Sequence, residues 1–82
     1  MNKTIRLNVA GKDIELSSEM VIEKLKGAHL GEVRTHAVLV DGVLHPVKKA
    51  FAAITGIDVL DFNTMVARAA FSKLGFKVLR ES

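Results

Sequence analysis

An Asp-Gly pair between two apolar runs is the feature that most limits how this chain can fold. Asp41-Gly42 separates Ala37–Val40 from Val43-Leu44. Both runs suit β-strands, and Asp-Gly readily takes the positive φ angles of a two-residue hairpin turn. Pro46 follows almost at once, and proline fits the first turn of a helix because an N–H would have no partner there. The chain from Asp41 onward is therefore predicted to form a hairpin and then a helix.

The apolar spacing after this turn predicts a helix from Pro46 to about Thr55. One face of that helix carries apolar side chains at helical spacing, namely Val47, Ala50, Phe51 and Ile54. Gly56 is expected to end the helix, since glycine adopts the left-handed cap conformation without strain. The opposite, outward face is predicted to hold Lys48, Lys49, Ala52 and Ala53.

A second helix is predicted to begin at Asn63 or Thr64, whose side chains can accept a hydrogen bond from free N–H groups of a first turn. Phe62 precedes them and can pack against the new helix. The core face of this helix is expected to hold Val66, Ala67, Ala70, Phe71 and Leu74. The exposed face is expected to hold Met65, Arg68, Ala69, Ser72 and Lys73. Gly75 should end the helix, with Phe76 folding back on Phe71 before a closing strand.

The N-terminal half shows a different pattern. Apolar and polar residues alternate over residues 4–16 around a central turn, which is typical of a half-buried hairpin. Ser17 or Ser18 can cap the short helix that follows. The side chains of that helix expected to face the core are Val21, Ile22 and Leu25. Residues 28–35 are predicted to be an exposed loop or a hinge between the two halves.

These elements predict one α+β domain spanning residues 1–82. The expected order is β-β-α-β-β-α-α-β, with three helices packed on a small, mostly antiparallel sheet. Both hairpins and the closing strand are expected to belong to that one sheet. A chain of 82 residues has the size of a single domain, and its high apolar share favours a folded core over disorder.

Composition limits the location and the partners. Twelve basic and nine acidic residues give a net charge of +3, a mild excess that permits an acidic partner such as nucleic acid. The chain has no cysteine, which excludes disulfides and is compatible with a reducing cytoplasm. No apolar run approaches the roughly 20 residues of a membrane-spanning helix, and no signal peptide is visible. We therefore expect a cytoplasmic protein without a membrane partner.

No pattern of catalytic, cofactor-binding or metal-ligating residues stands out. The three histidines, His29, His36 and His45, do not have the spacing of metal ligands on a helix. Asp58 and Asp61 flank a turn, where aspartate commonly bonds to nearby backbone. Neither a phosphate-binding loop nor a dinucleotide motif is present. The sequence therefore predicts a protein that is not an enzyme and has no cofactor and no metal.

The C-terminal half carries a set of turn, cap and packing residues, namely Gly42, Pro46, Lys48, Asp61, Phe62, Leu74, Gly75, Phe76 and Val78. This set resembles a small module attached to HNH nuclease domains in McrA-type bacterial restriction proteins. In that module G-x-x-(Y)-P-x-K leads into a helix, a D-F pair precedes a second helix, and L-G-F-x-V ends it. This chain differs in having His45 where an aromatic residue is usual, and it lacks a nuclease domain. The resemblance implies contact with DNA in a restriction-associated role, without catalysis.

Basic residues on the two predicted helices offer a face for such contact. Lys48 and Lys49 lie in a first helical turn, where the macrodipole disfavours cations. They are either two solvated lysines or residues that converge with free N–H groups on a phosphate. The predicted contacts to double-stranded DNA are Lys48, Lys49, Asn63, Thr64, Arg68 and Lys73.

Small and apolar residues support an alternative partner. Ala52, Ala53 and Ala69 are predicted to lie on outer helix faces, where small side chains let another helix approach closely. Leu60 and Met65 can belong to the same surface. The alternative function is therefore a protein-interaction or homodimerisation module within a larger assembly.

Overall fold

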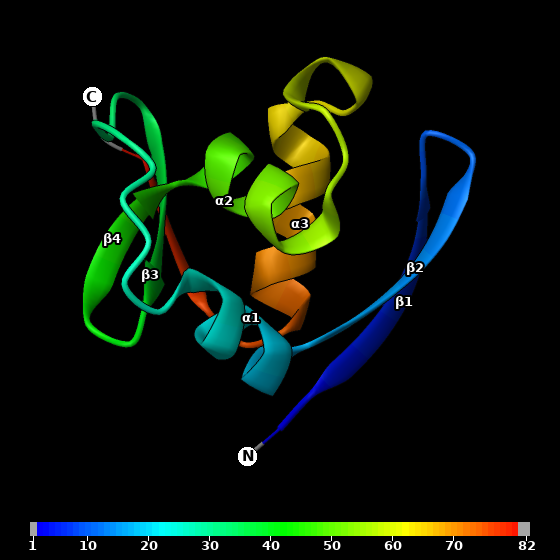
Figure 1. Ribbon diagram of the computed structural model, residues 1–82, viewed down its shortest axis with the longest axis horizontal. Helices are drawn as coiled ribbons and strands as arrows, with labels where there is room; N and C mark the ends of the chain where they lie inside the picture. The colour runs from blue at the N-terminus through cyan, green and yellow to red at the C-terminus, as the bar shows by residue number, and fades with distance from the viewer. Residues whose placement is uncertain (1, 81–82) are drawn as a thin grey trace.

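The order of secondary-structure elements is β-β-α-β-β-α-η-α-β in the computed structural model, which describes residues 2–80 (Figure 1). The strands are β1 (Thr4–Val9), β2 (Lys12–Ser17), β3 (His36–Val40), β4 (Val43–Pro46) and β5 (Lys77–Arg80). The helices are α1 (Ser18–Leu25), α2 (Val47–Thr55), the short 3₁₀ helix η1 (Val59–Asp61) and α3 (Thr64–Lys73). The predicted α+β class with three α-helices is confirmed, and η1 is an addition to the predicted order.

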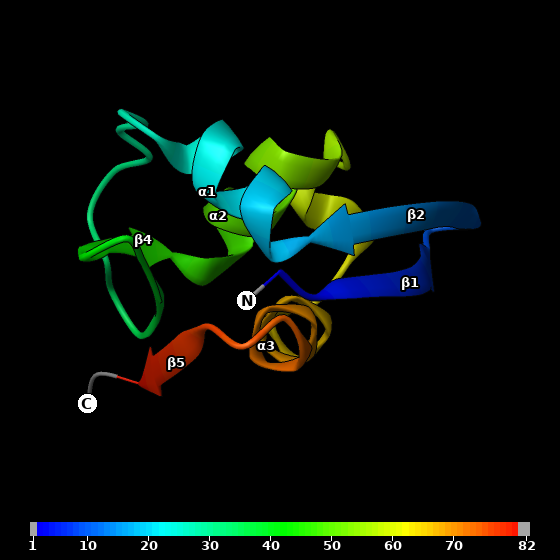
Figure 2. The same cartoon turned by 90° about the horizontal axis from the view of Figure 1, so that it is seen from below.

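The elements form three layers with the α-helices in the middle. Figures 1 and 2 show the hairpin β1–β2 on one side of the helices and the sheet β4-β3-β5 on the other. The prediction of a single sheet holding both hairpins is therefore wrong. Each hairpin has one apolar face, and both faces pack on the helices; Leu16 of β2 and Val38 of β3 are buried in the same core cluster. The two hairpins thus do not pair with each other, and each is stabilised by burying its apolar face against the helices.

Both hairpins close with a two-residue turn in which both residues have positive φ. Asp41 and Gly42 have φ angles of 50° and 79°, the geometry predicted for an Asp-Gly turn of type I′. Ala10 and Gly11 repeat this geometry at the tip of the first hairpin, with φ angles of 54° and 77°. The turn at Asp41 fixes the register of β4 on β3, in which Val38 pairs with His45.

Side chains from two segments cap the start of α1. Ser17 Oγ accepts a hydrogen bond from a backbone N–H of the first turn at 3.0 Å, as predicted for one of the two serines. Asn2 Oδ1 accepts another from Glu19 N at 2.9 Å. Ser18 is buried, and its Oγ accepts from Lys3 N at 2.7 Å. These bonds hold the N-terminal segment against the helix start.

Strand β4 runs directly into α2. Pro46 is the last residue of the strand and the N-cap of the helix, which therefore begins one residue later than predicted. Gly56 ends α2 with a φ of 77°, as predicted. Asn63 caps α3, because its Oδ1 accepts a hydrogen bond from Val66 N at 2.9 Å. The short path from β4 to α2 places the start of α2 at the edge of the three-stranded sheet.

The end of α3 matches the sequence prediction. Gly75 has a φ of 93°, and Phe76 N–H donates to the carbonyl oxygen of Phe71 at 3.0 Å. The rings of Phe71 and Phe76 pack edge to face with centroids 6.3 Å apart. This is the Schellman ending, which satisfies the last carbonyl groups of a helix.

Aromatic rings join α2, α3 and the segment between them into one core. Phe51 packs edge to face on Phe62 and on Phe71, with ring centroids 4.7 and 6.2 Å apart. Helix α1 adds Val21 to the same cluster, and Leu30 of the following loop packs against it. Residues 28–35 contain no helix or strand. The buried residues on both sides of this loop thus belong to one core.

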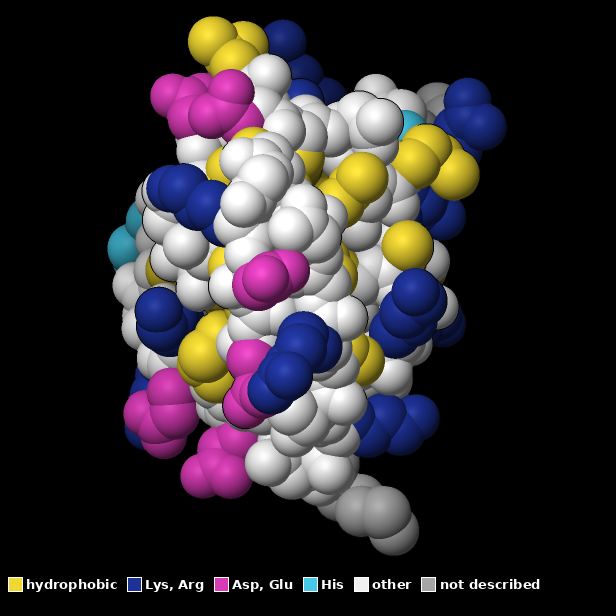
Figure 3. All heavy atoms as spheres, turned by 90° about the vertical axis from the view of Figure 1, so that its right-hand side faces the viewer, with side chains coloured by type: hydrophobic (Ala, Val, Ile, Leu, Met, Phe, Trp, Pro, Cys, Tyr) yellow, Lys and Arg dark blue, Asp and Glu magenta, His cyan; other side chains and the backbone are white. Residues whose placement is uncertain are grey.

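Two apolar side chains are placed differently from the prediction. Ile22 was expected to face inward but is 38% exposed, because α1 reaches the core through a narrow stripe formed by Val21 and Leu25. Ala52 was expected on the outer face of α2 but is half-buried against the core. On the side of the molecule drawn in Figure 3, acidic and basic side chains alternate and apolar ones form small separate patches.

Candidate functional site

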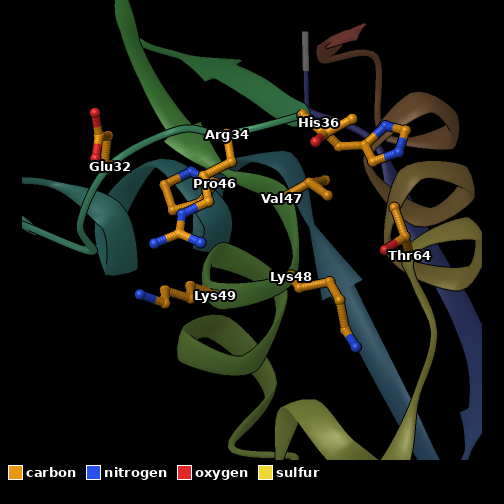
Figure 4. A pocket seen from close by; sticks show the side chains of 9 residues that line it. Glu32, Arg34, His36, Pro46, Val47, Lys48, Lys49 and Thr64 are labelled. Carbon is orange, nitrogen blue, oxygen red and sulfur yellow. The ribbon is translucent and has the colours of Figure 1, made fainter. Parts of the chain in front are cut away.

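A groove of about 540 Å³ opens between the loop before β3, the start of α2 and the start of α3. Its lining consists of Glu32, Arg34, Thr35, His36, Pro46, Val47, Lys48, Lys49 and Thr64. In Figure 4, Arg34 and Lys49 lie on one side of the groove and His36 and Thr64 on the other, with Lys48 between them. Three separate stretches of the chain thus supply polar side chains to one hollow.

The groove carries an excess of positive charge. Arg34, Lys48 and Lys49 line it together with a single carboxylate, that of Glu32. In the part of the chain that the structure describes, the one salt bridge joins Arg6 and Glu15 on the hairpin, so the groove cations form none. Cations without a carboxylate partner are available to an anion from solution.

The start of α2 adds unsatisfied donors to this charge. Pro46 provides no side-chain hydrogen bond to the first turn, and that turn contains no acidic residue. The N–H groups of a first helical turn carry the positive end of the macrodipole. Lys48 and Lys49 lie in this same turn, where they are electrostatically unfavourable until an anion binds. The local field and the side chains therefore favour the same kind of ligand.

An aromatic ring supports one of these lysines. The Nζ atom of Lys48 lies 5.4 Å from the centroid of the Phe62 ring, a cation–π contact. Lys48 is half-buried and Phe62 is buried, so the contact is partly shielded from water. Lys49 is exposed and lies against the loop, where its Nζ would be 3.2 Å from a Cβ atom placed on Gly31. The two lysines are thus held at different places in the groove, Lys49 at the loop and Lys48 near Phe62.

A histidine–arginine pair borders the groove at α3. Arg68 Nη1 lies 2.9 Å from His36 Nδ1 and 3.3 Å from the carbonyl oxygen of Leu79. Arg68 is half-buried and is not among the residues that line the groove. The expectation that Arg68 points freely outward is therefore wrong, because its guanidinium turns toward the sheet and finds acceptors there.

The six residues predicted as DNA contacts do not all lie together. Lys48, Lys49 and Thr64 line the groove, and Asn63 directly precedes Thr64 as the cap of α3. Arg68 does not line the groove, but it contacts the groove residue His36. Lys73 lines a different hollow, between β1 and α3.

Sequence reasoning missed two groove residues, Arg34 and His36. Arg34 stands in the irregular loop before β3, and His36 begins that strand. No periodicity or cap links these positions to α2, so only the folded path of the loop brings them to the groove. The cationic character of Arg34 was the one signal present in the sequence.

Other polar features give a weaker case for a site. His45 is buried, and burial lowers its pKa below the ordinary value of 6.5. It lines a hollow of only about 80 Å³ beside α1. Among residues 2–80, no three histidine or carboxylate side chains gather as metal ligands. None of the helices described in this chain has the length and apolar character needed to cross a membrane.

Comparisons with known proteins returned no family model, no curated protein and no solved structure that matches this chain. The resemblance to the module of McrA-type proteins therefore stays a prediction from the sequence.

Proposed function

We propose that this chain is a non-enzymatic module that binds double-stranded DNA through the groove at the start of α2. The observation that carries the proposal is the convergence of three cations, Arg34, Lys48 and Lys49, on the first turn of a helix, where they form no salt bridge with residues 2–80. Phosphate groups are the part of nucleic acid that such a site suits, since they accept hydrogen bonds from N–H groups and lysine or arginine. A cytoplasmic, restriction-associated role belongs to the same proposal.

The available side chains favour the backbone of a duplex over unpaired bases. Single-strand binding relies on exposed aromatic rings, on which bases stack. The chain has no tyrosine or tryptophan, while Phe51, Phe62 and Phe71 are buried and Phe76 is half-buried. Contacts to phosphate fix the position of a protein on DNA and carry little sequence information. We therefore expect binding with weak sequence preference and strong salt dependence.

A titration of a labelled duplex at several salt concentrations tests this function. Each phosphate contact adds about 0.9 to the slope of log affinity against log salt. The double variant Lys48→Ala/Lys49→Ala should weaken binding and lower that slope by about 1.8. The matched control Lys3→Ala/Lys12→Ala removes the same charge from the N-terminal segment and the first hairpin and should change the slope little. Equal losses from the two double variants would indicate diffuse attraction to the whole protein and would contradict the proposal.

A second candidate function is a protein-interaction or homodimerisation module. The observation that favours it is the exposure of large apolar side chains, above all Leu60 at 88% and Met65 at 70%. Such residues are a common feature of protein interfaces. Sedimentation of the chain alone over a range of concentrations tests self-association, and Leu60→Ser should abolish any dimer found. Binding that persists at high salt would favour this candidate, because apolar burial does not depend on counterion release.

A further inference from the structure

The contact between His36 and Arg68 defines which ring nitrogen of His36 carries a proton. Arginine stays protonated in proteins, so its Nη1 can only donate a hydrogen bond. His36 Nδ1, at 2.9 Å from Arg68 Nη1, must then be the acceptor and has no proton. A neutral imidazole with an unprotonated Nδ1 carries its proton on Nε2. The ring of a groove residue is thus fixed in one tautomer by a neighbour outside the groove.

We propose that His36 is an anion-binding residue of the groove, positioned by Arg68, and that its ring takes up a proton when a phosphate binds. This inference rests on the proposed function, because it concerns the same groove and the same class of ligand. The proton comes from solvent and is added to Nδ1, the nitrogen that accepts from Arg68 in the free protein. The ring then becomes an imidazolium with two N–H donors.

The charges around His36 explain why protonation and anion binding should be linked. Arg68 contacts the ring from α3, and Arg80 is the cross-strand partner of His36 on β5. The other charged groups near the groove are Glu32 and Arg34 of the preceding loop and Lys48 and Lys49 of α2. Among the residues that the structure describes, one carboxylate thus lies near five basic side chains. A phosphate bound among these groups adds a negative charge beside the ring and so favours an imidazolium.

Protonation also releases a donor. Once Nδ1 carries a proton it can no longer accept from Arg68 Nη1, whose remaining acceptor is the carbonyl oxygen of Leu79. A phosphate oxygen bound in the groove can then accept a charge-assisted hydrogen bond from the His36 ring. The phosphodiester of DNA keeps its single negative charge throughout the range in which histidine titrates. A proton taken up during binding is therefore bound by the protein and not by the DNA.

The other two histidines serve as internal controls. His29 is exposed in the loop after α1, and it is not among the groove residues. His45 is buried beside α1, in the separate hollow near Ile22. In the described part of the chain, neither residue forms a hydrogen bond with a groove cation. The link between proton uptake and DNA binding should therefore depend on His36 and not on the other two histidines.

The test is the affinity for a labelled duplex at constant salt from about pH 8 to about pH 5.5, the range in which histidines ordinarily titrate. Affinity should rise toward acid pH, by up to about tenfold per pH unit at the steepest point, the limit for one proton. In His36→Asn, the side-chain oxygen can still accept from Arg68 but cannot gain a charge, so the rise should be lost. His29→Gln should keep the full rise.

Two measurements on the unmodified protein do not depend on how well a variant folds. Nitrogen chemical shifts of the His36 ring, measured by NMR in the free protein at about pH 8, should show a proton on Nε2 and none on Nδ1. In a separate variant, Arg68→Met, the donor to Nδ1 is removed and the ring should change to a mixture of tautomers. Calorimetry of duplex binding in two buffers of different ionisation enthalpy should show net proton uptake.

The possible failures are distinguishable. A proton on Nδ1 in the free protein, an unchanged pH profile in His36→Asn, or calorimetry without proton uptake would each overturn the inference while leaving DNA binding in place. No binding of the duplex at any pH at low salt would overturn the proposed function and this inference with it.

Discussion

The contact between Lys48 and Phe62 gives the sharpest quantitative prediction about how the groove is built. Lys48 Nζ lies 5.4 Å from the ring centroid. Exposed cation–π contacts contribute about 0.5–1 kcal/mol and shielded ones more. Lys48 is half-buried, so we expect a contribution of about 1 kcal/mol.

A double-mutant cycle with Phe62→Leu and Lys48→Met isolates this interaction. Each single change also alters other terms, since Phe62 packs on Phe51 and Lys48 opposes the dipole of α2, but those terms cancel in the cycle. The double variant should be less destabilised than the sum of the singles by about 1 kcal/mol. For 82 residues, an unfolding entropy of about 170 cal/mol/K converts this to about 6 °C in Tm.

Urea unfolding of the four proteins provides the measurement, and Lys49 provides the control. Lys49 lies in the same helical turn but against the loop at Gly31. The cycle of Phe62→Leu with Lys49→Met should therefore be additive to within about 0.5 kcal/mol. Additivity in the Lys48 cycle, or equal coupling in both cycles, would refute the argument that Phe62 holds Lys48 at the groove.

Three further predictions concern stability. Gly75→Ala should lower the free energy of unfolding by about 1–2 kcal/mol because residue 75 has a φ of 93°; an unchanged Tm would contradict this. Asn63→Ala should cost about 1 kcal/mol through loss of the cap on α3, whereas Asn63→Asp should retain most of the stability in the same unfolding assay. Burial lowers the pKa of His45 in the folded protein below 6.5, so the unfolded chain binds more protons and stability should fall as pH drops below that value. Urea unfolding between neutral and acid pH should show this loss, and His45→Gln should reduce it.

Local chemistry made much of the fold predictable. The Asp41-Gly42 turn, the cap at Asn63 and the ending at Gly75 each depend on residues close in sequence. Such features are specified by φ preferences and short hydrogen bonds, which a sequence displays directly. The prediction failed where distant segments compete for the same partner. The two hairpins could pair edge to edge in one sheet or pack their apolar faces on the helices from two sides, and the structure has the second arrangement.

The candidate site was predictable in part for the same reason. Lys48, Lys49 and Thr64 belong to helix starts that the sequence defines. Arg34 and His36 reach the groove through the irregular path of residues 28–35, which no local rule specifies. Arg68 was placed on the correct helix, but its side chain follows the acceptors that β3 and β5 offer. The contacts between side chains of different helices and strands could therefore be assigned only from the structure.

The central claim, that DNA binds in the groove at the start of α2, is tested most directly by amide NMR. A short duplex is added to the labelled protein at low salt, and the change in each backbone amide signal is followed. The account predicts that the largest changes fall on residues 34–36, 47–49 and 64, around the groove. The amide signals of the hairpin β1–β2 should keep nearly the same chemical shifts when the duplex is added. Changes centred on the hairpin, or spread evenly over the surface, would contradict the claim.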